Sequence, residues 1–237
     1  MDIQLVDLRN LDPEKTDHGE HCQVSDSSFV EKKKRQLLFE VTEAENDHRD
    51  LNYAIFDLSI LTERDTKRIR SCYERLVNRI RLVILTSQLE EKTDMFKSKL
   101  RIYCEEFIQI VDDRVKPYYW VSIYVKANLL RLKADFLRYL FEIHPQNGNY
   151  QVRAHNAYTE AKLFFTTHRM TKTSEWYRSR LNYATLLYLD GFPTAALFIC
   201  QQLLKPAKTK VFDSAFEKRI RKNVDFFLNE LLSADQT

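Results

Sequence analysis

The sequence predicts an all-helical protein. It holds only 3 glycines and 5 prolines among 237 residues, too few for the turns of a β-sandwich, a β-barrel or a parallel α/β sheet. Apolar residues recur every three to four positions over long stretches, as they do on one face of a helix. With 44% hydrophobic and 30% charged residues, the composition is that of a soluble, globular chain.

The chain divides into a tail and one domain. Residues 1–26 lack helical periodicity and carry seven acids against two bases, a net charge of −5, which leaves +8 on the remainder. We therefore expect a flexible acidic N-terminal tail over 1–26 and a single helical domain over 27–237. A basic body beside an acidic tail is a hint about partners or about contact between the two, although such blocks often serve only solubility.

About nine helices joined by short loops are expected, so that neighbours run antiparallel. Thr62 and Asp65 have the spacing of a capping box at the start of the third helix. Pro117, Pro145 and Pro206 lie beyond the ends of three others. The expected helices span about 28–49, 51–58, 62–91, 93–115, 119–144, 150–169, 174–189, 193–204 and 213–232.

No motif indicates an enzyme, a metal or a cofactor. There is no glycine-rich phosphate loop, no HExxH and no nucleophile beside a glycine turn. The histidines do not share ligand spacing on one helix face, and we expect no metal. No apolar run reaches the length of a membrane span or of a signal peptide, so the expected location is the cytoplasm or the nucleus. Four scattered cysteines, without a CxxC pair, indicate reduced thiols: Cys22, Cys72, Cys104 and Cys200.

A ladder of alternating charge follows one face of the helix expected over 119–144. Arg131, Asp135, Arg138 and Glu142 form it, opposite a stripe of leucines and phenylalanines. By itself such a ladder favours a solvated face with ion pairs, and the alternative is the floor of a binding site. On the helix expected over 62–91, Glu74 and Arg81 share one face. Two arginines on neighbouring helices could hold one phosphate with forked hydrogen bonds.

Four short strings resemble the 14-3-3 family. LKADFLRYLFE at 132–142 is similar to the family's LKMKGDYYRYLAE helix, and LNY at 181–183 to its LNFSVFYYEI segment. CYERLV at 72–77 resembles AYKNVV, and RKNV at 221–224 resembles RDNL near the last helix. The strings fall in the family's order, and the resemblance covers most of 28–232.

The resemblance implies a cup-shaped, TPR-like bundle that dimerises through its N-terminal helices and binds phosphoserine or phosphothreonine peptides in a groove. By motif position, Arg81, Arg138 and Tyr139 match three of the four residues with which the family holds phosphate. Asn182 and Asn223 match the asparagines that hold the main chain of the peptide. The register that places Asn223 there also puts apolar residues on the inner positions of its helix: Phe216, Ile220, Val224 and Phe227.

The fourth phosphate ligand of the family, a lysine, is Glu74 in this chain, and its acidic companion is Leu189. A unit pair at about 4 Å is worth about 4 kcal/mol at an effective dielectric near 20. After discounting for solvent, the reversed charge should cost roughly 3 kcal/mol, about a hundredfold in affinity. Glu74 could also pair with Arg81 or Arg138 and occupy the phosphate site from within. At the dimer surface, Asp50 and Lys99 match one cross-subunit pair of the family.

Three classes of function follow in order of preference. The first is a non-enzymatic adaptor that binds phosphorylated client proteins with a weakened or altered phosphate site, as a homodimer or heterodimer. The second is a phosphate-independent 14-3-3-like scaffold that binds an acidic or helical segment. Nucleic acid binding by the basic body comes third and predicts a steep dependence on salt. No membrane association is expected.

Overall fold

The computed structural model describes residues 26–56, 61–86, 90–117, 121–205 and 214–234, and all the regular structure within them is helical. The expectation of an all-helical chain is thus confirmed for the described residues. These hold eight α-helices and one short π-helical segment, η1. Their bounds are α1 Asp26–Phe56, α2 Glu63–Thr86, α3 Glu90–Ile110, η1 Val111–Val115, α4 Ile123–Ile143, α5 Gly148–Thr167, α6 Ser174–Leu189, α7 Pro193–Leu204 and α8 Ser214–Ala234. The predicted acidic tail lies outside the described residues, except for Asp26, where α1 begins.

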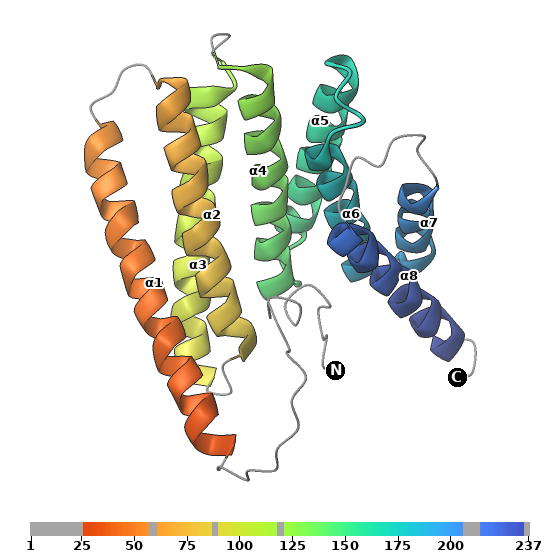
Figure 1. Ribbon diagram of the computed structural model, residues 1–237, viewed down its shortest axis with the longest axis horizontal. Coiled ribbons are helices and arrows are strands. Elements are labelled where there is room, and N and C mark those ends of the chain that lie inside the picture. Colours follow the sequence, from red (N-terminus) through yellow and green to blue (C-terminus); the bar gives the residue numbers. More distant parts are fainter. Residues whose placement is uncertain (1–25, 57–60, 87–89, 118–120, 206–213, 235–237) are drawn as a thin grey trace.

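Helix α4 is the central element. It contacts α2 and α3 in the first half of the chain and α5 and α6 in the second half. Figure 1 shows α1 to α4 as neighbouring rods, with α5 to α8 beyond α4. Consecutive helices contact each other in most cases, as the short loops predict. Side chains of α4 can therefore meet side chains from both halves of the chain.

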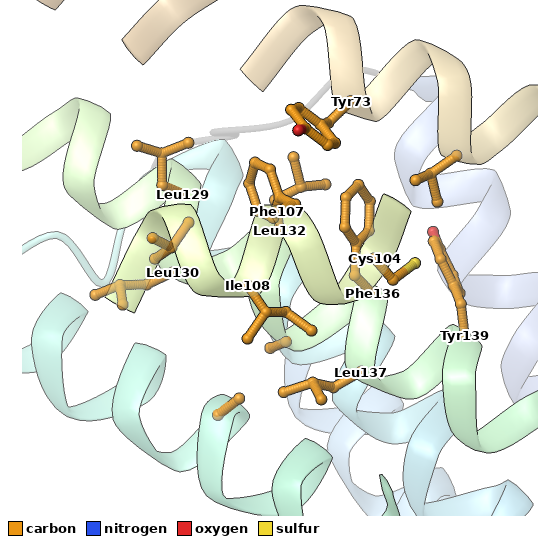
Figure 2. Packing of buried hydrophobic residues seen from close by; sticks show 14 of the residues in the cluster. Tyr73, Cys104, Phe107, Ile108, Leu129, Leu130, Leu132, Phe136, Leu137 and Tyr139 are labelled. Carbon is orange, nitrogen blue, oxygen red and sulfur yellow. The ribbon is translucent and has the colours of Figure 1, made fainter. Parts of the chain in front are cut away.

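The main core lies where α2, α3 and α4 meet, and it consists of large apolar side chains. Figure 2 shows Tyr73 of α2, Phe107 of α3 and Phe136 of α4 close together in this core, and neighbouring rings are tilted to each other. The ring centroids of Phe107 and Phe136 are 4.9 Å apart. Every residue of α4 from Leu129 to Phe141 is buried. This helix has no solvated face over those residues.

A second core joins α6, α7 and α8. Ile220 and Phe227 of α8 are buried in it, and Phe216 and Val224 pack against it. These are the four positions that the chosen register of the last helix assigned to its apolar side. The prediction for this helix face is confirmed.

The first two expected helices are one. Helix α1 runs without a break through Asp50, where the sequence analysis placed a boundary between 28–49 and 51–58. The buried stripe continues across this point, because Ala44, His48, Leu51 and Ile55 all face the core. Packing against the core therefore continues past Asp50 as far as Ile55 and overrides the weak local signal for an end. That prediction was wrong.

The start of α2 has the predicted cap. The Thr62 backbone N–H donates to the Asp65 carboxylate at 3.0 Å, and the Asp65 N–H donates to Thr62 Oγ1 at 3.2 Å. The hydrogen bonds from Thr62 lower the pKa of Asp65 below its usual value. The capping box fixes where α2 begins and hence the register of Glu74 and Arg81 along it.

Candidate functional site

The charge ladder on α4 is buried. Arg131, Asp135 and Arg138 are each less than 5% exposed, and the side chain of Glu142 is 7% exposed. The solvated face that the charge pattern by itself favours is excluded, because α4 is covered by helices from both halves of the chain. The alternative, the floor of a binding site, stays a prediction. Buried charges must be paired or hydrogen-bonded, so their partners define the chemistry of the site.

Arg81, Arg138, Tyr139 and Glu142 form a compact unit that we call the two-arginine clamp. Arg81 reaches over from α2, and its Nε donates to Glu142 Oε2 at 2.9 Å. Arg138 donates from Nη1 to the other oxygen of Glu142. Both guanidiniums also lie on the Tyr139 ring, with their central carbons 4.1 Å and 4.6 Å from its centroid. Three of the predicted site residues are therefore brought together.

Arg138 retains unused donors inside the clamp. Its Nε and Nη2 atoms are buried and have no hydrogen-bond partner within the described part of the chain. Burial by itself lowers the pKa of this guanidinium, but Glu142 and other neighbours outweigh burial and raise it well above the usual value. The group is therefore charged, and a buried donor without an acceptor costs about 1–3 kcal/mol. An acceptor placed there would remove this cost.

The other half of the ladder surrounds Arg131 with three carboxylates. Arg131 pairs with Asp135 on its own helix, with Glu175 of α6 at 2.9 Å and with Glu74 of α2 at 3.5 Å. Glu74 also lies 3.5 Å from Arg70. The suggestion that Glu74 pairs with Arg81 or Arg138 was wrong, since Glu142 takes that place. Glu74 points instead toward Arg131.

Asn182 belongs to this Arg131 half, whereas Asn223 does not. Asp135 Oδ1 accepts hydrogen bonds from Asn182 Nδ2 at 2.9 Å and from the Tyr158 hydroxyl at 2.7 Å. Burial and the charge of Asp135 raise the pKa of Tyr158 well above its usual value. Asn223 lies half-buried on α8, and among the described residues its side chain has no hydrogen-bond partner. The predicted pair of asparagines is thus not joined in one network.

The two halves differ in charge balance. The clamp holds two guanidiniums against one carboxylate, whereas the Arg131 half, with Arg70 counted through its pair with Glu74, holds two guanidiniums against three carboxylates. Sequence reasoning missed Glu175 and Tyr158, which come from other helices and carry no local signal. The sequence does carry a local signal for the pair between Glu142 and Arg138, because their i,i+4 spacing favours an ion pair. An anion would be drawn to the clamp and repelled from the Arg131 half.

The expected dimer surface is partly engaged within the chain. Lys99 of α3 donates to Glu45 of α1 at 2.7 Å, and the Tyr103 hydroxyl donates to the same oxygen at 3.1 Å. Asp50, the expected partner of Lys99 across a dimer, is exposed on α1. The pair between Lys99 and Glu45 fastens α1 to α3 in one protomer.

The described residues show neither a metal site nor a membrane span. No group of three or more histidine, cysteine, aspartate or glutamate side chains in the described ranges could hold a metal ion. None of the described helices has the length and apolarity needed to span a membrane. No protein-family model matches the sequence, and no curated protein matches it. We therefore infer function from the charges and contacts of the side chains themselves.

Proposed function

We propose that this chain is a non-enzymatic adaptor that binds a phosphoserine or phosphothreonine segment of a client protein through the two-arginine clamp. One observation carries the proposal: Arg81 and Arg138, from different helices, meet on Tyr139, and two buried nitrogens of Arg138 have no acceptor among the described residues. Phosphate, like carboxylate, matches the planar fork of a guanidinium through parallel hydrogen bonds, and a dianionic phosphate carries the larger charge. These are also the residues that the resemblance to the 14-3-3 family assigns to phosphate.

The phosphate site is weakened by its internal occupant. Glu142 already bridges Arg81 and Arg138, so an incoming phosphate must share the guanidiniums with this carboxylate or displace it. In either case the binding free energy of the phosphate is less favourable than it would be without Glu142. We therefore propose modest affinity and a preference for the dianionic phosphate over a single carboxylate.

Arg131 does not serve as a third phosphate ligand in this proposal. Three carboxylates surround it, and their charges raise its pKa against the opposing effect of burial. A phosphate placed there would meet net negative charge. The proposed groove therefore has one anion-binding end, at the clamp, and one acidic end, at Arg131.

The second candidate is a phosphate-independent scaffold, and the burial of the clamp favours it. Arg138 is 0% exposed and Arg81 is 4% exposed, so a ligand reaches them only if neighbouring groups move. In this reading the clamp is an internal ion-pair network that holds α2 against α4. A client segment would then bind elsewhere on the helices, and its phosphorylation would not matter.

Titration of two matched peptides against the full chain separates the candidates. One fluorescein-labelled peptide carries a central phosphoserine and the other carries serine at that position. We expect at least about tenfold tighter binding of the phosphorylated peptide, which corresponds to about 1.4 kcal/mol. Arg81→Gln should remove the preference, whereas Arg79→Gln, a control two residues away that loses a half-exposed pair with Glu40, should keep it.

Equal binding of both peptides by the unsubstituted chain and by Arg81→Gln would establish the phosphate-independent scaffold in place of the adaptor. Binding of neither peptide, with the chain folded by circular dichroism, would reject both peptide-binding functions for these sequences. A preference that Arg79→Gln also removes would point to general surface charge, and it should then disappear at high salt.

A further inference from the structure

A pocket lies between α1 and α3, away from the clamp. Its volume is about 760 Å³, which is within the usual range for small-molecule sites. His48 and Asn52 of α1 and Glu106 of α3 form a polar floor, and Tyr53 and Ile102 form the apolar rim. All of its lining residues lie in the described part of the chain.

The floor carries a carboxylate without a full cationic partner. Glu106 accepts hydrogen bonds from Asn52 at 2.8 Å, and its other oxygen lies 3.1 Å from His48 Nε2. Within the described ranges, no lysine or arginine lies within ion-pair distance of it. Burial opposes ionisation of Glu106, but the hydrogen bond and charge of His48, together with the hydrogen bonds from Asn52 and Tyr73, outweigh burial and lower its pKa. It is therefore charged at neutral pH.

The second carboxylate of the pocket, Glu45, is already matched, because it accepts from Lys99 and from the Tyr103 hydroxyl. Arg49 is exposed to solvent and donates to the neutral amide oxygen of Asn46, so its charge is screened by water and neutralises neither carboxylate. Glu106 is thus the lining carboxylate whose charge is open to an incoming cation. A cation placed beside it would be only partly shielded from it by water, because the carboxylate is about one-third exposed.

The rim supplies apolar surface for a ring. Tyr53 is 78% exposed and Ile102 is 57% exposed, so more than half of the surface of each residue faces solvent. Deeper in the pocket, His48 and Tyr103 meet edge to face with ring centroids 4.9 Å apart. Aromatic side chains beside a half-buried carboxylate suit a molecule with a flat apolar body and a basic end.

We propose that the α1–α3 pocket binds a small organic cation, a basic amine carried on an aromatic body, with the amine on Glu106 and the ring between Tyr53 and Ile102. This site is separate from the proposed phosphate clamp. The pocket is lined by residues of α1 and α3, whereas the clamp consists of residues of α2 and α4, and the two share no residue. Failure of either proposal therefore leaves the other intact.

Tryptamine and indole-3-propionate are the matched probes, because they share the indole ring and differ in the sign of the terminal charge. Isothermal titration on the full chain should show tryptamine binding at least about tenfold more tightly. Glu106→Gln keeps the size and an acceptor for Asn52, and it should remove this difference. Glu160→Gln, which loses a carboxylate paired to Lys116 on another face, should leave it unchanged.

Tyr53→Ala provides an independent check, since the exposed ring can be removed without opening the core. It should weaken both probes by a similar factor while the preference for the amine remains. Equal affinity for the two probes, or an amine preference that survives Glu106→Gln, would overturn the proposal. So would light scattering that shows a dimer together with no tryptamine binding, because a second copy of the chain would then cover the pocket. The phosphopeptide preference should be unaffected by Glu106→Gln.

Discussion

Glu142→Gln should change stability and phosphopeptide affinity in opposite directions. The carboxylate lies 2.7 Å and 2.9 Å from two nitrogens of Arg81 and also accepts from Arg138, with its side chain 7% exposed. Removing one partner of a buried ion pair costs about 3–5 kcal/mol. Glutamine keeps the size and one acceptor oxygen, so we expect the lower end, a loss of about 3 kcal/mol in the free energy of unfolding.

The same substitution should favour a phosphate in the clamp. A carboxylate and a dianionic phosphate about 6 Å apart repel by about 5 kcal/mol at an effective dielectric near 20. Water and movement of the side chains reduce this figure substantially. We expect affinity for the phosphoserine peptide to rise at least about tenfold, or about 1.4 kcal/mol, with little change for the serine peptide.

Two assays on the same samples test this prediction: urea unfolding followed by circular dichroism, and anisotropy titration of both peptides. Glu160→Gln is the control, because it removes a half-exposed carboxylate from Lys116 and Lys133 on another part of the molecule. It should leave peptide affinity unchanged. A destabilised Glu142→Gln protein with unchanged or weaker phosphopeptide binding would show that the clamp is structural only.

Three further predictions concern other parts of the chain. Gly191 and Arg169 each follow the end of a helix at positive φ, 82° and 56°. Gly191→Ala should therefore lower the free energy of unfolding by about 1 kcal/mol, measured by thermal unfolding. Arg169→Gly should raise it by a few tenths to about 1 kcal/mol. Because the pKa of Glu106 is lower in the folded chain than in the unfolded chain, its ionised carboxylate stabilises the fold above the unfolded pKa, and this contribution is lost as the pH falls through the folded pKa. The difference in free energy of unfolding between the parent chain and Glu106→Gln should therefore shrink below about pH 4 in acid denaturation. Burial raises the pKa of the Cys72 thiol to about 11 and that of Cys200 to about 12, so peptide mapping after iodoacetamide at pH 8 should find both unmodified unless the chain is unfolded.

The helical fold could be predicted from local signals, because these act within a few residues. The range expected at 174–189 agrees with α6, and that at 193–204 agrees with α7. Thr173 caps the first through its side chain and Pro193 begins the second, which are signals that a sequence displays directly. The merged α1 could not be predicted in the same way. Its continuity depends on burial of Leu51 and Ile55 in the core beside α2.

The site could be predicted only in part, for a related reason. Periodicity places Arg138 and Glu142 on one face of a helix, but it cannot say whether that face meets water or another helix. The partners that decide this, Arg81 and Glu175, come from α2 and α6. Motif resemblance supplied Arg81, whereas nothing in the sequence indicated Glu175. The spacing of residues along one helix therefore cannot predict contacts with segments that are distant in the sequence.

The position of Glu74 is best understood together with Arg131. Glu74 lies 3.5 Å from the Arg131 guanidinium, which is 4% exposed and needs carboxylates around it to be buried with its charge. A lysine at position 74 would bring a second cation to this group and leave only Asp135 and Glu175 to balance both. The acidic residue at 74 and the buried arginine at 131 therefore suit each other electrostatically. Because Glu74 is directed to Arg131, the charge that most directly opposes a phosphate on Arg81 and Arg138 is that of Glu142. The weakening first attributed to Glu74 should thus be sought at Glu142, one helical turn beyond Arg138 on the same helix.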